Sequence, residues 1–269
     1  MDIVRQKDEI GAFKNLWHGG FREGDPLDTM GISTYGPFGY MSCLYATYLC
    51  CIKPYITKES NVLEIGPGRG AWTKCFITRG AKEIWAIDAL SAEHNGFWDY
   101  VGVHENVRYF QVEDNTCSMV PDESIDYFFS FGCFCHLSPN AINDYMTYAY
   151  KKMRPGSHGF FMFADYDKYN SLIENESKYS ISRMFETKRF IPILLAWRIV
   201  FSIFKSNKLQ FQNKNEDDII TPGRWYHLGV DNAENMLKKI GFEVIEKDVG
   251  VIQRDPIVHF FKPLGSSSK

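Results

Sequence analysis

Three glycines on alternate positions follow a short, mostly apolar run and are the residues best suited to hold a ligand. Residues 62–65 are typical of a buried strand, and Gly66, Gly68 and Gly70 come directly after it. Glycine adopts positive φ and has no Cβ, so the backbone of this turn can lie against a bound molecule. Residues 71–79 favour a helix whose first N–H groups point back toward the same molecule. The segment therefore predicts a ligand-binding turn between a strand and a helix.

Two acidic residues near this turn bear on the kind of ligand. The glycine spacing alone also fits the looser dinucleotide fingerprint. Glu64, however, stands two residues before Gly66, where a carboxylate would repel a pyrophosphate and suit a cationic group. Asp88 ends a second apolar run 22 residues after Gly66, and an acid at that place accepts hydrogen bonds from ribose hydroxyls. Asp88 therefore supports a nucleoside-type site without choosing between ligands.

The pattern of Glu64, Gly66, Gly68 and Gly70 resembles the first motif of the class I S-adenosylmethionine-dependent methyltransferases. The resemblance covers residues 60–165 and, more loosely, 228–262. It implies S-adenosylmethionine as the cofactor, with its amino-acid end in the glycine turn. Asp114 would accept a hydrogen from the adenine amino group, although an ordinary turn acid is the alternative. The cofactor-binding residues that we expect are Glu64, Gly66, Gly68, Gly70, Trp72, Asp88, Ala89, Asp114, Asn115 and Phe131.

The resemblance also implies an α/β fold, a Rossmann-like and mostly parallel seven-stranded sheet with a final antiparallel strand. We expect strands at 62–65, 83–88, 107–112, 125–131, 160–165, 242–249 and 257–261. Helices are expected at 41–55, 71–79, 139–153, with Ser138 as the cap, and 231–240. Residues 1–55 would form an N-terminal cap, and the methyltransferase domain would span 56–265. Residues 167–222 exceed a simple crossover, so they are predicted to be a helical insertion after the fifth strand.

Candidates for catalysis stand at the ends of the fourth and fifth strands. An imidazole at His136 can take a proton from a hydroxyl acceptor at neutral pH. Asp165 would face the acceptor in this topology and position or deprotonate its hydroxyl. In the competing interpretations, His136 only orders its loop and Asp165 lies in a solvated one. Arginine together with aromatic rings suits a sugar or phosphorylated molecule. The expected substrate-binding residues are Tyr40, Tyr166, Arg224, Trp225, Tyr226 and His227. In the alternative interpretation, the last four of these only hold the insertion in place.

The acceptor is the least determined part of the resemblance. The chain is most similar in character to bacterial small-molecule and surface-sugar O-methyltransferases. This implies O-methylation of a sugar, nucleotide-linked sugar or phosphorylated metabolite in surface-polysaccharide biosynthesis. Two alternatives stay open. One is an N-methyltransferase of a small amine, which needs no strong base, and the other is a catalytically silent cofactor-binding subunit that serves as an assembly partner.

Composition limits the partners and the location. A net charge of −3 over 269 residues gives no pull toward nucleic acid. The apolar segment 190–205 is too short for a membrane span and is interrupted by Pro192 and Arg198, so a lid or homodimer helix is expected, with interfacial membrane contact as the alternative. Seven cysteines without paired C-x-x-C spacing, and an N-terminus without an apolar core, predict a cytoplasmic protein. The scattered histidines indicate no metal site, although a magnesium-dependent variant with Asp165, His136 and another ligand stays open as an alternative.

Overall fold

The structure, a computed structural model, describes residues 24–29, 37–38, 41–172, 174–175 and 225–264. The chain divides into two compact units. The first comprises Met1–Asp165 and Ile220–Lys269, and the second comprises Tyr166–Ile219. Of the second unit, residues 166–172 and 174–175 are described, and they are helical. The expected lid or dimer segment 190–205, together with Tyr40 and Arg224, lies outside the described residues.

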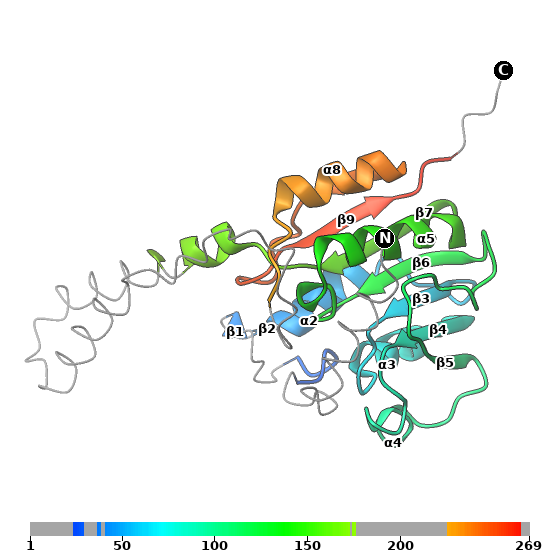
Figure 1. The fold of residues 1–269 in the computed structure, drawn as a ribbon. Helices are drawn as coiled ribbons and strands as arrows, with labels where there is room; N and C mark the ends of the chain where they lie inside the picture. The colour runs from blue at the N-terminus through cyan, green and yellow to red at the C-terminus, as the bar shows by residue number, and fades with distance from the viewer. Residues whose placement is uncertain (1–23, 30–36, 39–40, 173, 176–224, 265–269) are drawn as a thin grey trace, which may run out of the picture. The chain divides into compact units, whose positions relative to one another are not determined.

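The first unit is built on a seven-stranded sheet with the strand order β5-β4-β3-β6-β7-β9-β8 (Figure 1). The strands are β3 (Asn61–Ile65), β4 (Glu83–Asp88), β5 (Val107–Gln111), β6 (Ile125–Ser130), β7 (Met153–Met162), β8 (Glu243–Glu246) and β9 (Ile257–Phe261). The first five strands in this order, β5, β4, β3, β6 and β7, pair in parallel. β9 is antiparallel to both of its neighbours, β7 and β8. The predicted Rossmann-like sheet with a final antiparallel strand is confirmed.

Helices cover both faces of this sheet. On one face, α2 (Cys43–Thr47), η1 (Tyr48–Ile52), α3 (Ala71–Thr78) and α4 (Phe97–Val101) pack on the strands. On the other face lie α5 (Pro139–Lys152) and α8 (Val230–Ile240). The central strand β3 is buried along its whole length, which explains its apolar composition. Because the strands from β5 through β4, β3 and β6 to β7 are parallel, their carboxyl ends all lie at the same edge of the sheet.

Local sequence signals explain where several helices begin and end. The hydroxyl of Ser138 accepts a hydrogen bond from the N–H of Ala141, and Pro139 occupies the first turn of α5. Gly241 ends α8 with a φ of 115°, a left-handed conformation that glycine adopts without strain. A short hairpin of β1 (Pro37–Phe38) and β2 (Met41–Ser42) precedes α2.

Three elements differ most from the sequence-based expectation, and the other expected elements differ by no more than a residue or two. β7 begins at Met153, because that residue pairs with Ile125 across an irregular register, and it ends at Met162 before Asp165. The N-terminal helix expected at 41–55 is divided into an α-helical and a π-helical part. β8 stops at Glu246, before the turn in which Asp248 accepts the N–H of Gly250.

In the part of the chain that the structure describes, no helix has both the length and the apolar character needed to cross a bilayer.

Candidate active site

The glycine turn joins β3 to α3 at the carboxyl edge of the sheet. Gly66, Gly68 and Gly70 have φ values of 71°, 53° and 94°, so the predicted positive φ is confirmed at all three. Their surroundings differ. A Cβ on Gly66 would overlap Cys133, and one on Gly70 would overlap Val101, whereas one on Gly68 would meet nothing within 4 Å. Two of the glycines thus allow close packing of protein on protein, and only Gly68 stands beside open space.

Asp88 at the end of β4 is hydrogen-bonded to this turn. The backbone N–H of Gly68 donates to its Oδ2 at 3.1 Å, and the N–H of Leu90 donates to its Oδ1 at 2.9 Å. Burial raises the pKa of Asp88 to about 6, against the opposing effect of these hydrogen bonds. The Asp88 carboxylate therefore lies next to the one glycine that faces open space.

Glu64 lies inside the protein, on β3, with 1% of its surface exposed. Its Oε2 accepts a hydrogen bond of 2.6 Å from the hydroxyl of Thr73 on α3. Burial raises the pKa of Glu64 to about 8, and the charge of Asp88 adds to the shift. The raised pKa favours the protonated form of Glu64 at neutral pH.

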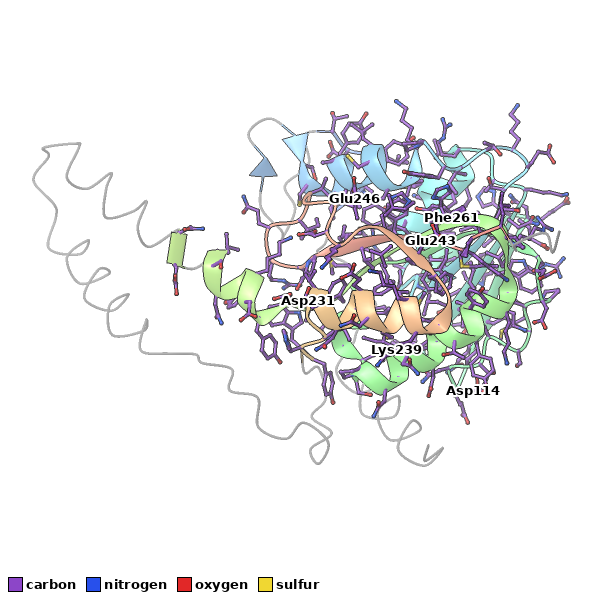
Figure 2. All side chains as sticks on the ribbon, turned by 90° about the horizontal axis from the view of Figure 1, so that it is seen from above. Asp114, Asp231, Lys239, Glu243, Glu246 and Phe261 are labelled. Atoms are coloured by element: carbon purple, nitrogen blue, oxygen red, sulfur yellow. The ribbon has the colours of Figure 1, made fainter. Side chains whose placement is uncertain are left out.

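The other expected cofactor residues occupy several environments. Asp114, in the loop after β5, accepts hydrogen bonds at Oδ1 from the N–H and the hydroxyl of Thr116. Figure 2 shows Asp114 at the margin of the molecule, apart from Asp231 and Glu243 of α8 and β8. Asn115 is buried, and the carbonyl of Ala89 accepts a hydrogen bond from Gln111.

Trp72 and Phe131 are buried against each other, with ring centroids 4.6 Å apart, and Trp72 also contacts Phe129 of β6. Both rings belong to the core between α3 and the sheet. Packing accounts for these two residues, so we leave them out of the cofactor site proposed below.

His136 ends the short 3-10 helix η2 (Phe134–His136), directly after β6. This loop is joined to the glycine turn, because Cys133 packs on Gly66. Burial raises the pKa of the Cys133 thiol to about 12, so it is not a nucleophile at neutral pH. On its other side the loop is joined to the expected acceptor segment, since the N–H of Tyr226 donates to the carbonyl of Cys135 at 2.9 Å.

Asp165, beyond β7, caps a helix. Its Oδ2 accepts the N–H of Val230 at 2.9 Å, at the start of α8, where the cap residue Gly229 has no side chain to do so. The chain around it is held by a bridge between Ala164 and His227. Asp165 thus has a structural task that the sequence did not indicate, and a catalytic role for it stays a prediction.

The acceptor segment is described from residue 225 onward. Trp225 is partly buried, and the guanidinium of Arg254 lies 5.4 Å from the centre of its ring. Arg254 forms an ion pair of 2.6 Å with the fully buried Asp255. Tyr226 is buried, and His227 is partly buried. Tyr166 begins the helical residues of the second unit and is described only within it.

Comparison with known proteins identifies the family. Residues 39–247 match the profile of a family described as a methyltransferase domain, which is more than half of the chain. The chain belongs to this methyltransferase family. It is an enzyme whose cofactor is S-adenosylmethionine. No match was found among curated proteins.

Solved structures agree with the methyltransferase fold. An S-adenosylmethionine-dependent methyltransferase from Mesorhizobium loti is 12% identical, with 82% of this chain and 98% of that chain covered and a TM-score of 0.52. A protein from Pyrococcus horikoshii is 17% identical over 82% of this chain and 92% of its own, also with a TM-score of 0.52. At such identities the likeness concerns the fold alone.

The methyltransferase site also contains residues that the sequence-based analysis missed. Thr73 donates to the buried Glu64, and Asn95 and Tyr109 belong to the hydrogen-bonded group around the partly buried Asp88. A buried glutamate must find a hydrogen-bond donor, so a hydroxyl on the following helix was a usable signal for Thr73. Asn95 and Tyr109 had no such signal, because nothing in their local sequence relates them to Asp88.

The donor set suits the methyltransferase cofactor. Open space at Gly68 leaves the backbone approachable, and the turn has two acids, Glu64 before it and Asp88 hydrogen-bonded to it, of the kind that an ammonium group and ribose hydroxyls would require. No group of three or more His, Cys, Asp or Glu side chains gathers as metal ligands would in the described part of the chain.

Proposed function

We propose that this methyltransferase transfers the methyl group of S-adenosylmethionine to a hydroxyl of a small polar acceptor. A sugar, a nucleotide-linked sugar or a phosphorylated metabolite of surface-polysaccharide biosynthesis is the substrate class. The observation that supports the cofactor site is the hydrogen bond from the N–H of Gly68 to the Asp88 carboxylate, at a glycine with open space beside it. In the proposed site, Glu64, the glycine turn, Asp88, Ala89, Asp114 and Asn115 hold the cofactor.

When bound, the cofactor supplies an electrophilic methyl group on a sulfonium. The chain's own part is to align the acceptor oxygen with that carbon and to accept the proton of the hydroxyl. We assign proton acceptance to His136, whose loop packs on the glycine turn through Cys133. Asp165, Trp225, Tyr226 and His227 are proposed to line the acceptor side, and the sequence suggests Tyr40, Tyr166 and Arg224 in addition.

The acceptor chemistry is supported by the aromatic and charged residues beside this edge. Trp225 with the neighbouring Arg254 offers a ring for the apolar face of a sugar and a cation for an anionic substituent. The proposal places the reaction in the cytoplasm, and it agrees with the absence of disulfides among the seven cysteines, all of which are described. Dimerisation through residues 190–205 remains part of the sequence-based prediction.

Calorimetric titration tests the cofactor assignment. S-adenosylhomocysteine should bind the wild-type protein, and NAD should not. Asp88→Ala and Asp114→Ala should each weaken binding of S-adenosylhomocysteine by about tenfold or more, the value of a hydrogen bond to a charged group. Lys239→Ala, on the exposed side of α8, is the matched control and should bind as the wild type does. Binding of NAD alone, or of neither ligand, would refute the proposed site.

A second experiment separates O-methylation from N-methylation. Candidate sugars, phosphorylated sugars and small amines are incubated with labelled cofactor, and the active acceptor is then tested with His136→Ala. Loss of about a hundredfold or more in kcat, with S-adenosylhomocysteine affinity retained, supports transfer to a hydroxyl. An amine substrate whose methylation survives the substitution would establish the N-methyltransferase alternative. Normal cofactor binding without transfer to any acceptor would favour the silent assembly partner.

A further inference from the structure

The inference concerns the side chains that surround the Asp88 carboxylate. Asn95 lies in the turn between β4 and α4 and is 3% exposed. Its amide Nδ2 donates to the hydroxyl of Tyr109 on β5 at 2.8 Å. That hydroxyl in turn donates to the carbonyl of Leu90 at 2.7 Å. The direction of the second bond fixes the first, because a hydroxyl that has given its proton to a carbonyl can only accept from the amide.

The Asn95 side chain also hydrogen-bonds the Asp88 carboxylate and lowers its pKa. Both N–H groups of the amide are thereby used, one on Asp88 and one on Tyr109. The Oδ1 of Asn95 is buried and has no partner in the described part of the chain. A buried amide oxygen without a partner costs free energy of folding.

We propose that Asn95, supported by Tyr109, is a positioning residue that keeps the Asp88 carboxylate ionised and oriented toward the ribose hydroxyls of the cofactor. The inference rests on the proposed function, because it requires that Asp88 binds the ribose. Its physical basis is geometric. The N–H groups of Gly68 and Leu90 use one acceptor direction on each carboxylate oxygen, and the Asn95 amide uses a third, so one of about four is left for a ligand.

Tyr109 holds Asn95 in turn. Its ring packs on Phe97 of α4 with centroids 4.7 Å apart, and its strand pairs with Ala86 of β4. The hydroxyl therefore has a fixed position relative to the end of β4. Removing it leaves the Asn95 amide without its second acceptor, so the amide can rotate away from Asp88.

Asp88 is the group near this site that titrates around pH 6. The titratable side chains whose charges interact with it come from four other elements, and burial raises the pKa of each; they are Glu64, Tyr109, Cys133 and Tyr145. Glu64, with a pKa of about 8, is protonated at pH 6. A change in ligand affinity between pH 6 and 8 therefore reports Asp88, once the same measurement in Glu64→Gln has removed the contribution of Glu64.

The experiment measures S-adenosylhomocysteine affinity by calorimetry at pH 6, 7 and 8, for the Glu64→Gln protein alone and with Asn95→Leu added. With an Asp88 pKa of about 6, affinity should fall about twofold from pH 8 to pH 6. Loss of the amide should raise that pKa by about one unit, so that the fall becomes about tenfold. A 2′,3′-dideoxy analogue of the ligand should show no such difference between the two proteins.

Asn61→Leu is the matched control. Asn61 is also a buried asparagine of the same sheet with an unpartnered Oδ1, but its amide donates to Ser124 at the opposite edge. It should leave the pH dependence unchanged. If Asn95→Leu does not fold, Tyr109→Phe replaces it in the same measurement. We expect Tyr109→Phe to raise the pKa of Asp88 as well, but by less.

Each result has one meaning. If Glu64→Gln fails to bind the ligand but the wild type binds it, the wild-type background is used for the same comparison. If the wild type does not bind, the proposed function and this inference fall together. Binding by the wild type, with affinity lowered by the same factor at every pH in Asn95→Leu or Tyr109→Phe, overturns only the positioning role.

Discussion

The hydroxyl of Thr73 donates a 2.6 Å hydrogen bond to the carboxyl group of Glu64, inside the protein and next to the glycine turn. It joins α3 to the central strand β3. Because the acid is almost completely buried, its protonation state couples folding, pH and the charge of any ligand in the site. The predictions below begin with this pair.

Glu64→Gln should remove a pH dependence of stability. The folded-state pKa of Glu64 is raised from 4.5 to about 8, so the folded protein binds the proton more tightly than the unfolded chain does. Its contribution is fully present below pH 4.5 and is lost as the pH rises to 8, with a slope of up to about 1.4 kcal/mol per pH unit. Urea denaturation of both proteins from pH 5 to 8 measures this. Parallel curves for wild type and variant would contradict it.

Gly66→Ala and Gly68→Ala should separate packing from ligand approach. Both positions have positive φ, which costs an alanine about 1–2 kcal/mol. The new methyl at Gly66 also overlaps Cys133, so we expect an additional loss of about 1–3 kcal/mol. At Gly68 the methyl meets nothing in the protein but takes up space beside the backbone that the proposed ligand would contact. The free energy of S-adenosylhomocysteine binding should therefore fall by more than the free energy of unfolding does. Thermal denaturation and calorimetry on both variants test this, and equal stability would count against it.

Lys262→Met should destabilise the fold without touching the site. Lys262 is 6% exposed, and its ammonium donates to the carbonyls of Tyr150 and Met153 at 2.9 and 2.8 Å, where α5 ends. Loss of these bonds leaves two carbonyls at the negative end of the helix dipole without their partner, at a cost of about 2–3 kcal/mol. Lys239→Met on the exposed face of α8 should change stability by less than about 0.5 kcal/mol. Chemical denaturation compares the two, and a similar effect for both would disprove the capping role.

His259→Gln should reduce the sensitivity of the fold to acid. The Nε2 of His259 lies 3.0 Å from the Nδ1 of His158, and its ring stacks on that of Phe160 with centroids 4.1 Å apart. Burial, with a smaller effect of His158, lowers the pKa of His259 from 6.5 to about 4. The stability that neutral His259 contributes above pH 6.5 is therefore lost as the pH falls toward 4. Melting temperatures at pH 7, 6 and 5 should fall less in the variant, while the exposed control His94→Gln should follow the wild type.

Much of the fold was predictable because its signals are local. The second strand, 83–88, and the last, 257–261, were predicted with the bounds that the structure shows. Their apolar runs end at acids, glycines or prolines that mark the ends. The beginning of β7 was missed, because residues 153–156 read as a turn, and only pairing of Met153 with Ile125 makes them part of the strand.

The sequence alone determines the kind of protein this is: an acid, three alternate glycines and a second acid at the end of the next strand, spaced as in a methyltransferase. These features lie within about 25 residues, and short stretches of chain specify them through φ preferences and strand length. Tertiary structure decides what each charged group does. It raises the pKa of Glu64 through burial, against the opposing hydrogen bond from Thr73, joins Asp88 to Asn95 and Tyr109, and makes Asp165 a cap for α8. Those partners come from other elements, and a pKa or a hydrogen bond depends on distance in space, which spacing along the chain does not specify.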